Sequence, residues 1–153
     1  MTAADRDETA VTYRGVVYPW HCDQVGHMNV MWYVGKFDEA TWNLFLRVGI
    51  TPGYLRSNHR GMAAVDQHIE YRRELHAGDV VAIRSEILQV EGRKIRFRHQ
   101  MTNAETGEVA AVTTLLGVHM DTQARKACPF PPEILARGRA LCPAETDRGA
   151  ASG

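Results

Sequence analysis

The sequence predicts an α+β fold in which one long helix packs against an antiparallel β-sheet. Two patterns predict it: one segment repeats apolar residues at intervals of three and four, and the segments after it alternate apolar and polar residues between short breaks. A single helix cannot cover a broad sheet and both of its edges. The same layout therefore predicts that the chain self-associates.

The first predicted elements are a strand and the long helix. Residues 9–19 are rich in valine and tyrosine, and Pro19 ends the strand. The helix spans residues 30–48, with Asn29 as its N-cap and the segment "GITPG" as its end. Its apolar face consists of Val30, Tyr33, Val34, Phe37, Ala40, Thr41, Leu44, Phe45 and Val48. Its polar face consists of Lys36, Asp38, Glu39, Asn43 and Arg47.

Four strands and a short helix are predicted after a loop that includes "RSNHRG". The strands fall in residues 63–75, 78–90, 92–101 and 107–120, where alternation replaces the helical spacing. Because the breaks between them are short, an antiparallel meander is predicted. Residues 129–141 begin with prolines and predict the short helix. The third strand alternates most regularly, with Ile95, Phe97 and Met101 inward and Arg96, Arg98 and Gln100 outward.

Length and composition indicate a single domain over residues 11–142, with flexible segments at 1–10 and 143–153. Acidic and basic residues are equal at 18 each, so no net field favours nucleic acid or an anionic membrane. No apolar run is long enough to cross a bilayer, and the polar first ten residues do not resemble a signal peptide. Three cysteines without a paired spacing favour a reducing compartment, the cytoplasm.

The candidate catalytic residues lie in one crowded stretch, "YPWHCDQVGHMNVMWYVGKFDEATW", at residues 18–42. It places Asp23 in the loop before the helix, where first-turn amides and the helix dipole can stabilise an oxyanion. An ionised Asp23 can activate water as a general base or attack a carbonyl directly.

Three other interpretations of this stretch stay open from the residues alone. His21, Asp23 and His27 could bind a metal ion, although their spacing matches no common metal motif. Cys22 could be a nucleophile beside a histidine. In the third interpretation, Asp23 and His27 only stabilise the turn through hydrogen bonds.

The segment "DQVGHMNVMWY", residues 23–33, resembles the Asp-x-x-Gly-His-x-Asn-x-x-x-Tyr signature of hotdog-fold acyl-CoA thioesterases, the 4-hydroxybenzoyl-CoA thioesterase-like group. The match has no gap and includes Gly26, His27, Asn29 and Tyr33. A second segment, "IEYRRELHAGDVV" at residues 69–81, is similar to a strand and turn of the same family. With the order of the elements, the resemblance extends over residues 13–121.

The resemblance implies a hotdog fold, in which a curved antiparallel sheet wraps the long central helix. It also implies a homodimer or dimer of dimers with active sites at the subunit interface. Asp23 would be the catalytic carboxylate, amides near Val30 would bind the thioester oxygen, and His27 and Asn29 would order the substrate-binding loop. Neither a metal nor a cofactor is implied, because coenzyme A is part of the acyl-CoA substrate. Glu39 on the helix is the alternative catalyst.

The nature of the acyl group is predicted from aromatic residues and from a narrower resemblance. Trp20, Trp32 and Tyr33 lie near the proposed site in sequence, and aromatic rings bind quaternary ammonium groups through cation–π attraction. Trp42 is assigned to packing instead. The stretch at residues 18–42, with "RGMAAV" and "RREL", especially resembles the betainyl-CoA thioesterases of carnitine catabolism. An uncharged short-chain or aromatic acyl group is the alternative.

The CoA phosphates are predicted to bind Arg72, Arg73 and Arg96, which belong to a basic cluster on strands and turns. The alternative is that these arginines form an ordinary solvated face. Two further functions remain: a non-catalytic acyl-CoA-binding protein of the same fold, and a hydratase or dehydratase. The intact Asp23 argues against the first, and the aspartate-led loop argues against the second.

Overall fold

The structure is a computed structural model that describes residues 2–5 and 10–143 of the 153-residue chain. The flexible ends predicted at 1–10 and 143–153 fall mostly outside these residues. The chain forms two compact units, each described by itself. The first comprises Met1–Phe45, His68–Ser85 and Arg98–Thr114, and the second comprises Leu46–Gln67, Glu86–Phe97 and Leu115–Gly153.

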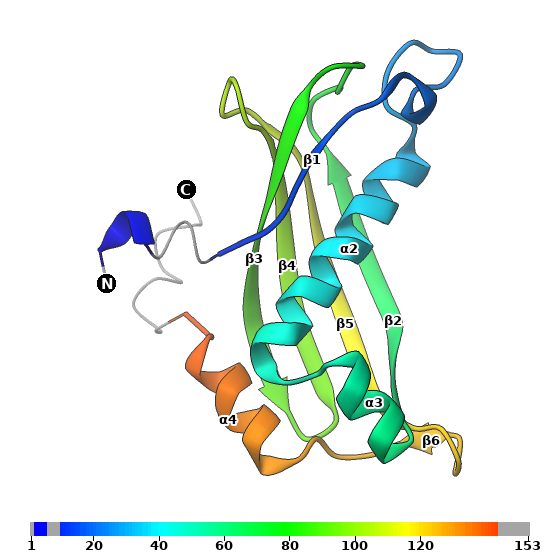
Figure 1. Cartoon of the computed structure of the whole chain (residues 1–153), viewed down its shortest axis with the longest axis vertical. Coiled ribbons are helices and arrows are strands. Elements are labelled where there is room, and N and C mark those ends of the chain that lie inside the picture. Colours follow the sequence, from blue (N-terminus) through cyan, green and yellow to red (C-terminus); the bar gives the residue numbers. More distant parts are fainter. Residues whose placement is uncertain (1, 6–9, 144–153) are drawn as a thin grey trace. The chain divides into compact units, whose positions relative to one another are not determined.

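The helices and strands follow the predicted order, with three short additions. The predicted elements are β1 (Val11–Val16), α2 (Val30–Val48), β2 (Arg60–Tyr71), β3 (Val80–Glu91), β4 (Lys94–Asn103), β5 (Val109–Asp121) and α4 (Pro132–Ala140) (Figure 1). The additions are a 3-10 turn η1 (Pro19–His21), α3 (Pro52–Asn58) and β6 (Lys126–Ala127). The segment "GITPG", predicted only to end α2, also starts α3, because Thr51 accepts from the Tyr54 amide at 3.0 Å as an N-cap.

The strand order is β1-β3-β4-β5-β2, with β6 paired to β5. β3, β4 and β5 are neighbours in chain order, as predicted, but β2 lies beside β5 rather than β3, so the four-strand meander is wrong. The reason lies in residues 72–79, which are no tight hairpin. Leu75 in this segment is buried, and its carbonyl accepts from the Met28 amide at 2.7 Å. The connection therefore packs against the loop before α2.

In the first unit, α2 packs one face against the sheet (Figure 1). The buried Phe37 ring stacks on His99 of β4, with 5.9 Å between ring centroids. The core cluster consists of Val17, Met28, Tyr33, Phe37, Ala40, Leu75, Val81, Ile83, Met101, Ala110 and Ala111. Val30 and Val34 were predicted to join the buried face but are 55% and 41% exposed.

Lys36 was predicted to lie on the polar face of α2, and this was wrong, because only 4% of the residue is exposed. Its Nζ donates to the Tyr13 hydroxyl at 3.0 Å and to the Val16 carbonyl at 3.4 Å. The Tyr13 ring lies over Gly15, where a Cβ atom would be 2.2 Å from the phenol oxygen. Helical periodicity could not show that β1 covers this side of the helix.

In the second unit, α4 packs closely on β3. A Cβ atom at Gly138 would lie 2.6 Å from a methyl group of Val90, so only glycine allows this approach. Ile134 of α4 is buried in the same region.

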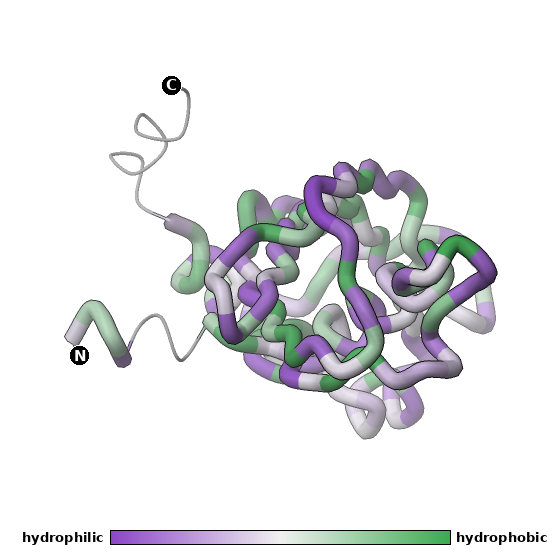
Figure 2. Tube along the Cα trace, turned by 90° about the horizontal axis from the view of Figure 1, so that it is seen from above, coloured by the Kyte–Doolittle hydropathy of each residue, from purple (hydrophilic) through white to green (hydrophobic). Residues whose placement is uncertain are grey.

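Hydrophilic and hydrophobic residues follow each other in short bands along the trace (Figure 2). On β4 this alternation confirms the predicted inward residues, since Ile95, Phe97 and Met101 are all buried.

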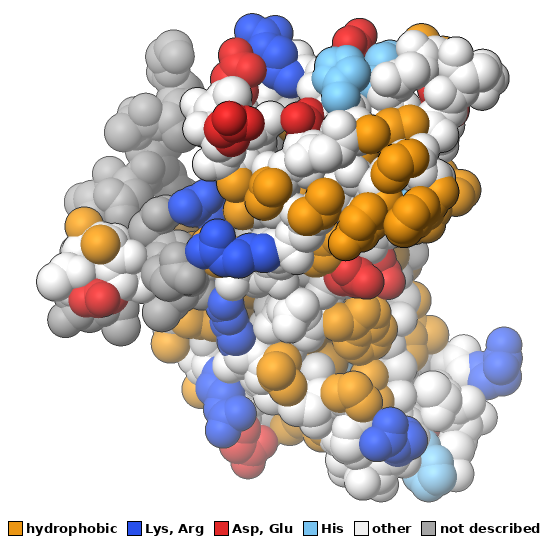
Figure 3. Space-filling view, turned by 45° about the horizontal axis from the view of Figure 1, so that its top comes forward, with side chains coloured by type: hydrophobic (Ala, Val, Ile, Leu, Met, Phe, Trp, Pro, Cys, Tyr) orange, Lys and Arg blue, Asp and Glu red, His pale blue; other side chains and the backbone are white. Residues whose placement is uncertain are grey.

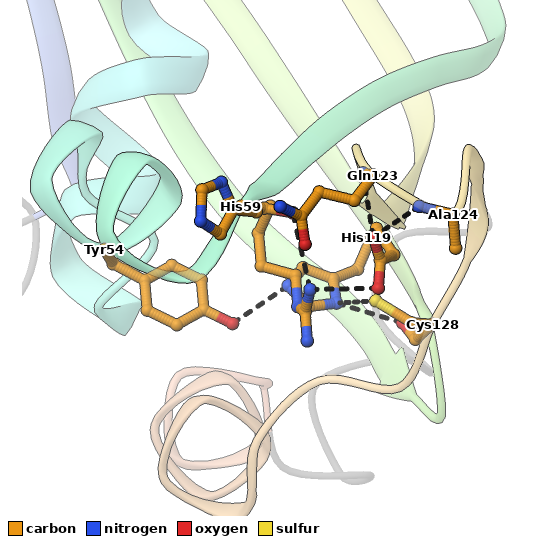
Figure 4. A network of polar contacts seen from close by, with 8 residues as sticks. Tyr54, His59, His119, Gln123, Ala124 and Cys128 are labelled. Carbon is orange, nitrogen blue, oxygen red and sulfur yellow. Dashed lines mark hydrogen bonds and ion pairs between the residues drawn. The ribbon is translucent and has the colours of Figure 1, made fainter.

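A polar network in the second unit joins α3, β5 and the turn after it (Figure 4). The His119 ring accepts from or donates to three groups: Nε2 contacts the Tyr54 hydroxyl at 3.0 Å, and Nδ1 contacts the Cys128 carbonyl at 2.9 Å and its Sγ at 3.4 Å. A carbonyl only accepts, so Nδ1 carries the proton and Nε2 accepts from Tyr54. His119 is therefore no base for the Cys128 thiol. Burial lowers the pKa of His119 and keeps the ring neutral.

Among the described residues, no helix combines the length and the apolar character that a membrane span requires.

Candidate active site

The loop that carries Asp23 is a tight turn closed by backbone hydrogen bonds. The Asp23 amide donates to the His27 carbonyl at 3.2 Å, and the Gly26 amide donates to the Asp23 carbonyl at 3.0 Å. Gly26 has a φ of 92°, in the region that favours glycine, so the turn depends on this residue. Cys22 and Met28 form a bridge across the base of the loop. The sequence between η1 and α2 thus folds back on itself and presents Asp23 near the helix start.

The Asp23 carboxylate is half-buried and held by two donors. The Asn29 side-chain amide donates to Oδ2 at 2.8 Å, and the Val25 amide donates to Oδ1 at 2.9 Å. These two bonds, the Asn29 bond first, lower the pKa of Asp23 below its ordinary value. The lowered pKa keeps the carboxylate ionised, and the two hydrogen bonds orient it. Each carboxylate oxygen still has a second lone pair with which it can react.

Asn29 connects the carboxylate to the helix. Its Oδ1 accepts from the Met31 amide at 3.0 Å, which confirms the predicted N-cap. Because the oxygen of the side chain is committed to the cap, its NH₂ group must face Asp23. Within the described part of the chain, the Val30 amide at the first position of α2 donates to no acceptor. One side chain therefore fixes an ionised carboxylate beside a helix end with a free amide, the pair that acyl transfer requires.

His21, His27 and Cys22 make their polar contacts with groups other than the Asp23 carboxylate. His21 Nδ1 accepts from the Tyr18 amide at 3.1 Å, and Cys22 Sγ lies 4.0 Å from the Tyr18 carbonyl. His27 Nε2 lies 3.6 Å from a carboxylate oxygen of Glu74. Over residues 2–5 and 10–143, no three side chains of the His, Cys, Asp or Glu type gather as a metal site requires. Glu39, the alternative catalyst, is exposed on α2.

The three predicted aromatic residues do not gather around one cavity. The Trp20 ring is 67% exposed and stacks on Tyr18, with centroids 4.6 Å apart. The Trp32 ring is partly buried and lies 4.1 Å from the His21 ring. Tyr33 is buried, and its hydroxyl donates to the Arg73 carbonyl at 3.2 Å. Of the three, only Tyr33 lines the cavity beside the Asp23 loop.

That cavity has a volume of about 250 Å³ and lies between the end of the loop and the end of β2. Its lining residues from the loop and α2 are His27, Met28, Val30 and Tyr33, and those from β2 and the segment after it are Tyr71, Arg72, Arg73 and Glu74. Sequence reasoning missed Tyr71 and Glu74 as site residues. The segment "YRREL" could have indicated them, because it begins at the last residue of β2 and contains both an aromatic ring and a carboxylate.

The predicted phosphate ligands fall in two places. Arg72 and Arg73 line the cavity of the first unit, where Arg72 pairs with Glu70 at 2.8 Å and Arg73 with Glu108 at 3.8 Å. Arg96 belongs to the second unit and lines a polar cavity of about 390 Å³ together with Lys94. The structure thus places two of the three arginines beside the Asp23 loop.

The curved sheet around the long helix defines the fold class, the hotdog fold. A family model described as the thioesterase-like superfamily matches residues 17–138. The chain therefore belongs to the thioesterase-like superfamily.

Two known proteins that are similar to this chain have betainyl-CoA thioesterase in their names. The betainyl-CoA thioesterase of Pseudomonas aeruginosa is 23% identical over 137 residues, covering 90% of this chain and 86% of that protein. The L-carnitine dehydrogenase/betainyl-CoA thioesterase of Agrobacterium fabrum is 27% identical over 113 residues, covering 74% of this chain. This chain spans only 23% of that longer relative.

A solved structure, a hypothetical protein from Staphylococcus aureus in complex with CoA, has the same fold. It superposes with a TM-score of 0.80 at 17% identity and covers 88% of this chain and 87% of that chain. At this identity the likeness concerns the fold alone.

Proposed function

We propose that the protein is an acyl-CoA thioesterase that hydrolyses a short acyl-CoA to the free acid and CoA, with Asp23 as its catalytic residue. The observation that carries the proposal is that one residue, Asn29, both holds the ionised Asp23 carboxylate and caps the helix whose first amide, that of Val30, is free among the described residues. The family to which the chain belongs supports the same reaction. A thioester is already an activated acyl group, so the reaction needs no metal and no added cofactor.

The reaction can follow one of two routes from the same geometry. In the first, an Asp23 oxygen attacks the thioester carbon, the C–S bond breaks, and the thiolate of CoA leaves and takes a proton from water. Water then hydrolyses the acyl anhydride and restores the carboxylate. In the second, Asp23 takes a proton from a water molecule that attacks the thioester. Both routes need the ionised carboxylate, which the lowered pKa of Asp23 provides.

The Val30 amide has the role of the oxyanion donor in both routes. The carbonyl oxygen gains negative charge when the tetrahedral intermediate forms, and an amide at a helix start donates to it without reorganising. His27 orders the turn through its carbonyl, which accepts from the Asp23 amide. CoA phosphates would bind Arg72 and Arg73, because their exposed ion pairs with Glu70 and Glu108 are weak enough for a phosphate to compete.

The acyl group is proposed to be betainyl, as in the names of the two relatives. A pathway that forms betaine from carnitine would supply such a thioester. The free cysteines and the CoA thioester both favour the cytoplasm as the compartment.

Release of free CoA thiol from a panel of acyl-CoAs tests the proposal. The panel consists of betainyl-, acetyl-, butyryl- and benzoyl-CoA, and we expect the highest kcat/KM for betainyl-CoA, by about tenfold or more. If an uncharged substrate is hydrolysed faster, the thioesterase activity stands and the betainyl assignment fails. If no substrate releases thiol while CoA still binds, the protein is a non-catalytic acyl-CoA-binding protein.

We also propose that the protein is a homodimer, or a dimer of dimers, that pairs through β2. This strand is at the edge of the sheet, and residues 64–68 are exposed whichever way their side chains point. Such a long uncovered edge readily pairs with another strand. Hydrophobic side chains also gather on the face shown in Figure 3. Outside the proposed substrate cavity, Met31 and Val34 of α2 are among the exposed hydrophobic residues.

Sedimentation at micromolar concentration is expected to show a mass of at least two chains. Val65, which is 57% exposed on β2, offers a test of the surface, because Val65→Lys should shift the mass toward one chain. A wild-type protein that sediments as one chain would contradict the proposal.

A further inference from the structure

Among the residues that line the cavity beside the Asp23 loop, one carries a carboxylate, Glu74. Arg72 and Arg73 also line the cavity, but each is paired with a carboxylate outside it, Glu70 at 2.8 Å and Glu108 at 3.8 Å. Glu74 instead has two imidazoles as its partners, His27 at 3.6 Å and His76 at 3.7 Å. An imidazole balances a carboxylate only when it is protonated. Among the described residues, Glu74 is therefore not committed to an arginine or lysine, and its carboxylate can bind a cationic ligand.

Two tyrosines form a corner in the same cavity. The rings of Tyr33 and Tyr71 are perpendicular, at 89°, with centroids 5.1 Å apart. Tyr33 is buried and its hydroxyl is bound to the Arg73 carbonyl, whereas Tyr71 is 48% exposed and can present its ring to a ligand. The pKa of Tyr33 is raised to about 12, first by burial and then by the neighbouring Tyr71 and Glu74. The Tyr33 ring therefore stays neutral, and the π faces of both tyrosines attract a cation.

We propose that Glu74 and Tyr71 bind the cationic head group of the acyl chain and so select an acyl-CoA that carries a quaternary ammonium group. A carboxylate and an aromatic face are the two groups that recognise such a cation, the first by charge and the second by cation–π attraction. The selectivity rests on the proposed thioesterase function. The proposal assigns recognition of the ammonium group to Tyr71 and Glu74 rather than to Trp20 and Trp32, which do not line the cavity.

The position of the cavity fits this role. Its lining includes His27, Met28 and Val30, which belong to the loop and helix start that hold Asp23. An acyl group bound there would have its carbonyl beside the Val30 amide and its head group toward Glu74. Met28 and Val30 supply apolar surface for the methyl groups of the ammonium.

The test compares two substrates that differ only in charge. Betainyl-CoA carries a trimethylammonium group, and 3,3-dimethylbutyryl-CoA has a carbon atom in place of the nitrogen. In Glu74→Gln, the ratio of kcat/KM for betainyl-CoA over its neutral analogue is expected to fall by about tenfold. Tyr71→Leu should lower the same ratio by about threefold or more. Glu105→Gln, on the exposed turn after β4, makes the same change in net charge and should leave the ratio unchanged.

Each outcome decides between the two proposals. A wild-type enzyme that hydrolyses both substrates with equal kcat/KM, or a Glu74→Gln variant with the wild-type ratio, would overturn the cation site and leave the thioesterase intact. Absence of hydrolysis of either substrate would instead refute the proposed function. Because the ratio is measured within one protein preparation, a partly unfolded variant lowers both rates and does not change it.

Discussion

Replacement of Asp23 by asparagine is expected to lower kcat/KM for acyl-CoA hydrolysis by roughly 10³-fold. The amide has nearly the same shape as the carboxylate, but it cannot attack the thioester and is not a base. It also has one accepting oxygen, whereas Asp23 accepts from both Asn29 and Val25. One of these donors must then bind water, which is accessible because the side chain is half-buried. The measurement is thiol release, with circular dichroism as the control for folding.

The companion variant Asn29→Asp isolates the positioning of that carboxylate. An aspartate keeps the helix cap, because its oxygen can accept from the Met31 amide as Asn29 does now. It removes the donor to Asp23 and adds a second negative charge, so the pKa of Asp23 should rise. Activity needs the ionised carboxylate. The acidic limb of the kcat/KM profile should therefore move to higher pH.

The two variants together distinguish a catalytic from a structural role. If Asp23→Asn keeps most of the activity, the carboxylate only stabilises the turn and Glu39 becomes the next candidate. If Asn29→Asp lowers the rate equally at every pH, Asn29 acts on the loop structure and not on the ionisation of Asp23.

The local parts of this fold and site could be predicted from the sequence. The helical spacing of residues 30–48 and the cap at Asn29 depend on neighbours within a few positions, so α2 and the Asp23 loop were found. Features that depend on distant segments were missed. β2 lies beside β5, Lys36 is covered by β1, and Tyr71 and Glu74 reach the loop only because residues 72–79 fold back onto it. No periodicity in one segment carries that information.

His99 is another residue whose role comes from the tertiary structure. It is fully buried in the first unit, and both ring nitrogens are bound: Nδ1 to the Ser85 hydroxyl at 2.5 Å and Nε2 to the Thr41 hydroxyl at 2.8 Å. Thr41 donates its own proton to the Phe37 carbonyl, so it accepts from His99 Nε2. Nδ1 must then accept from Ser85. This neutral imidazole connects α2 to β3 and holds in place the helix whose start presents the Val30 amide.

The burial of His99 should make the protein sensitive to acid. Desolvation lowers its pKa to about 3, from 6.5. Below pH 6.5 the unfolded chain therefore binds a proton that the folded chain does not, and the free energy of unfolding falls by about 1.4 kcal/mol per pH unit as the pH drops toward 3.

His99→Gln removes the imidazole that binds a proton in the unfolded chain. The glutamine amide can still accept from Ser85 and donate to Thr41. The pH slope of the variant's unfolding free energy should be smaller than that of wild type by this amount, whatever the variant loses at neutral pH. Carboxylates titrate equally in both proteins, so the difference between the two slopes reports His99 alone. Equal slopes for His99→Gln and wild type in urea unfolding from pH 7 to pH 4 would show that His99 is already protonated in the folded state, and that the neutral link between α2 and β3 is wrong.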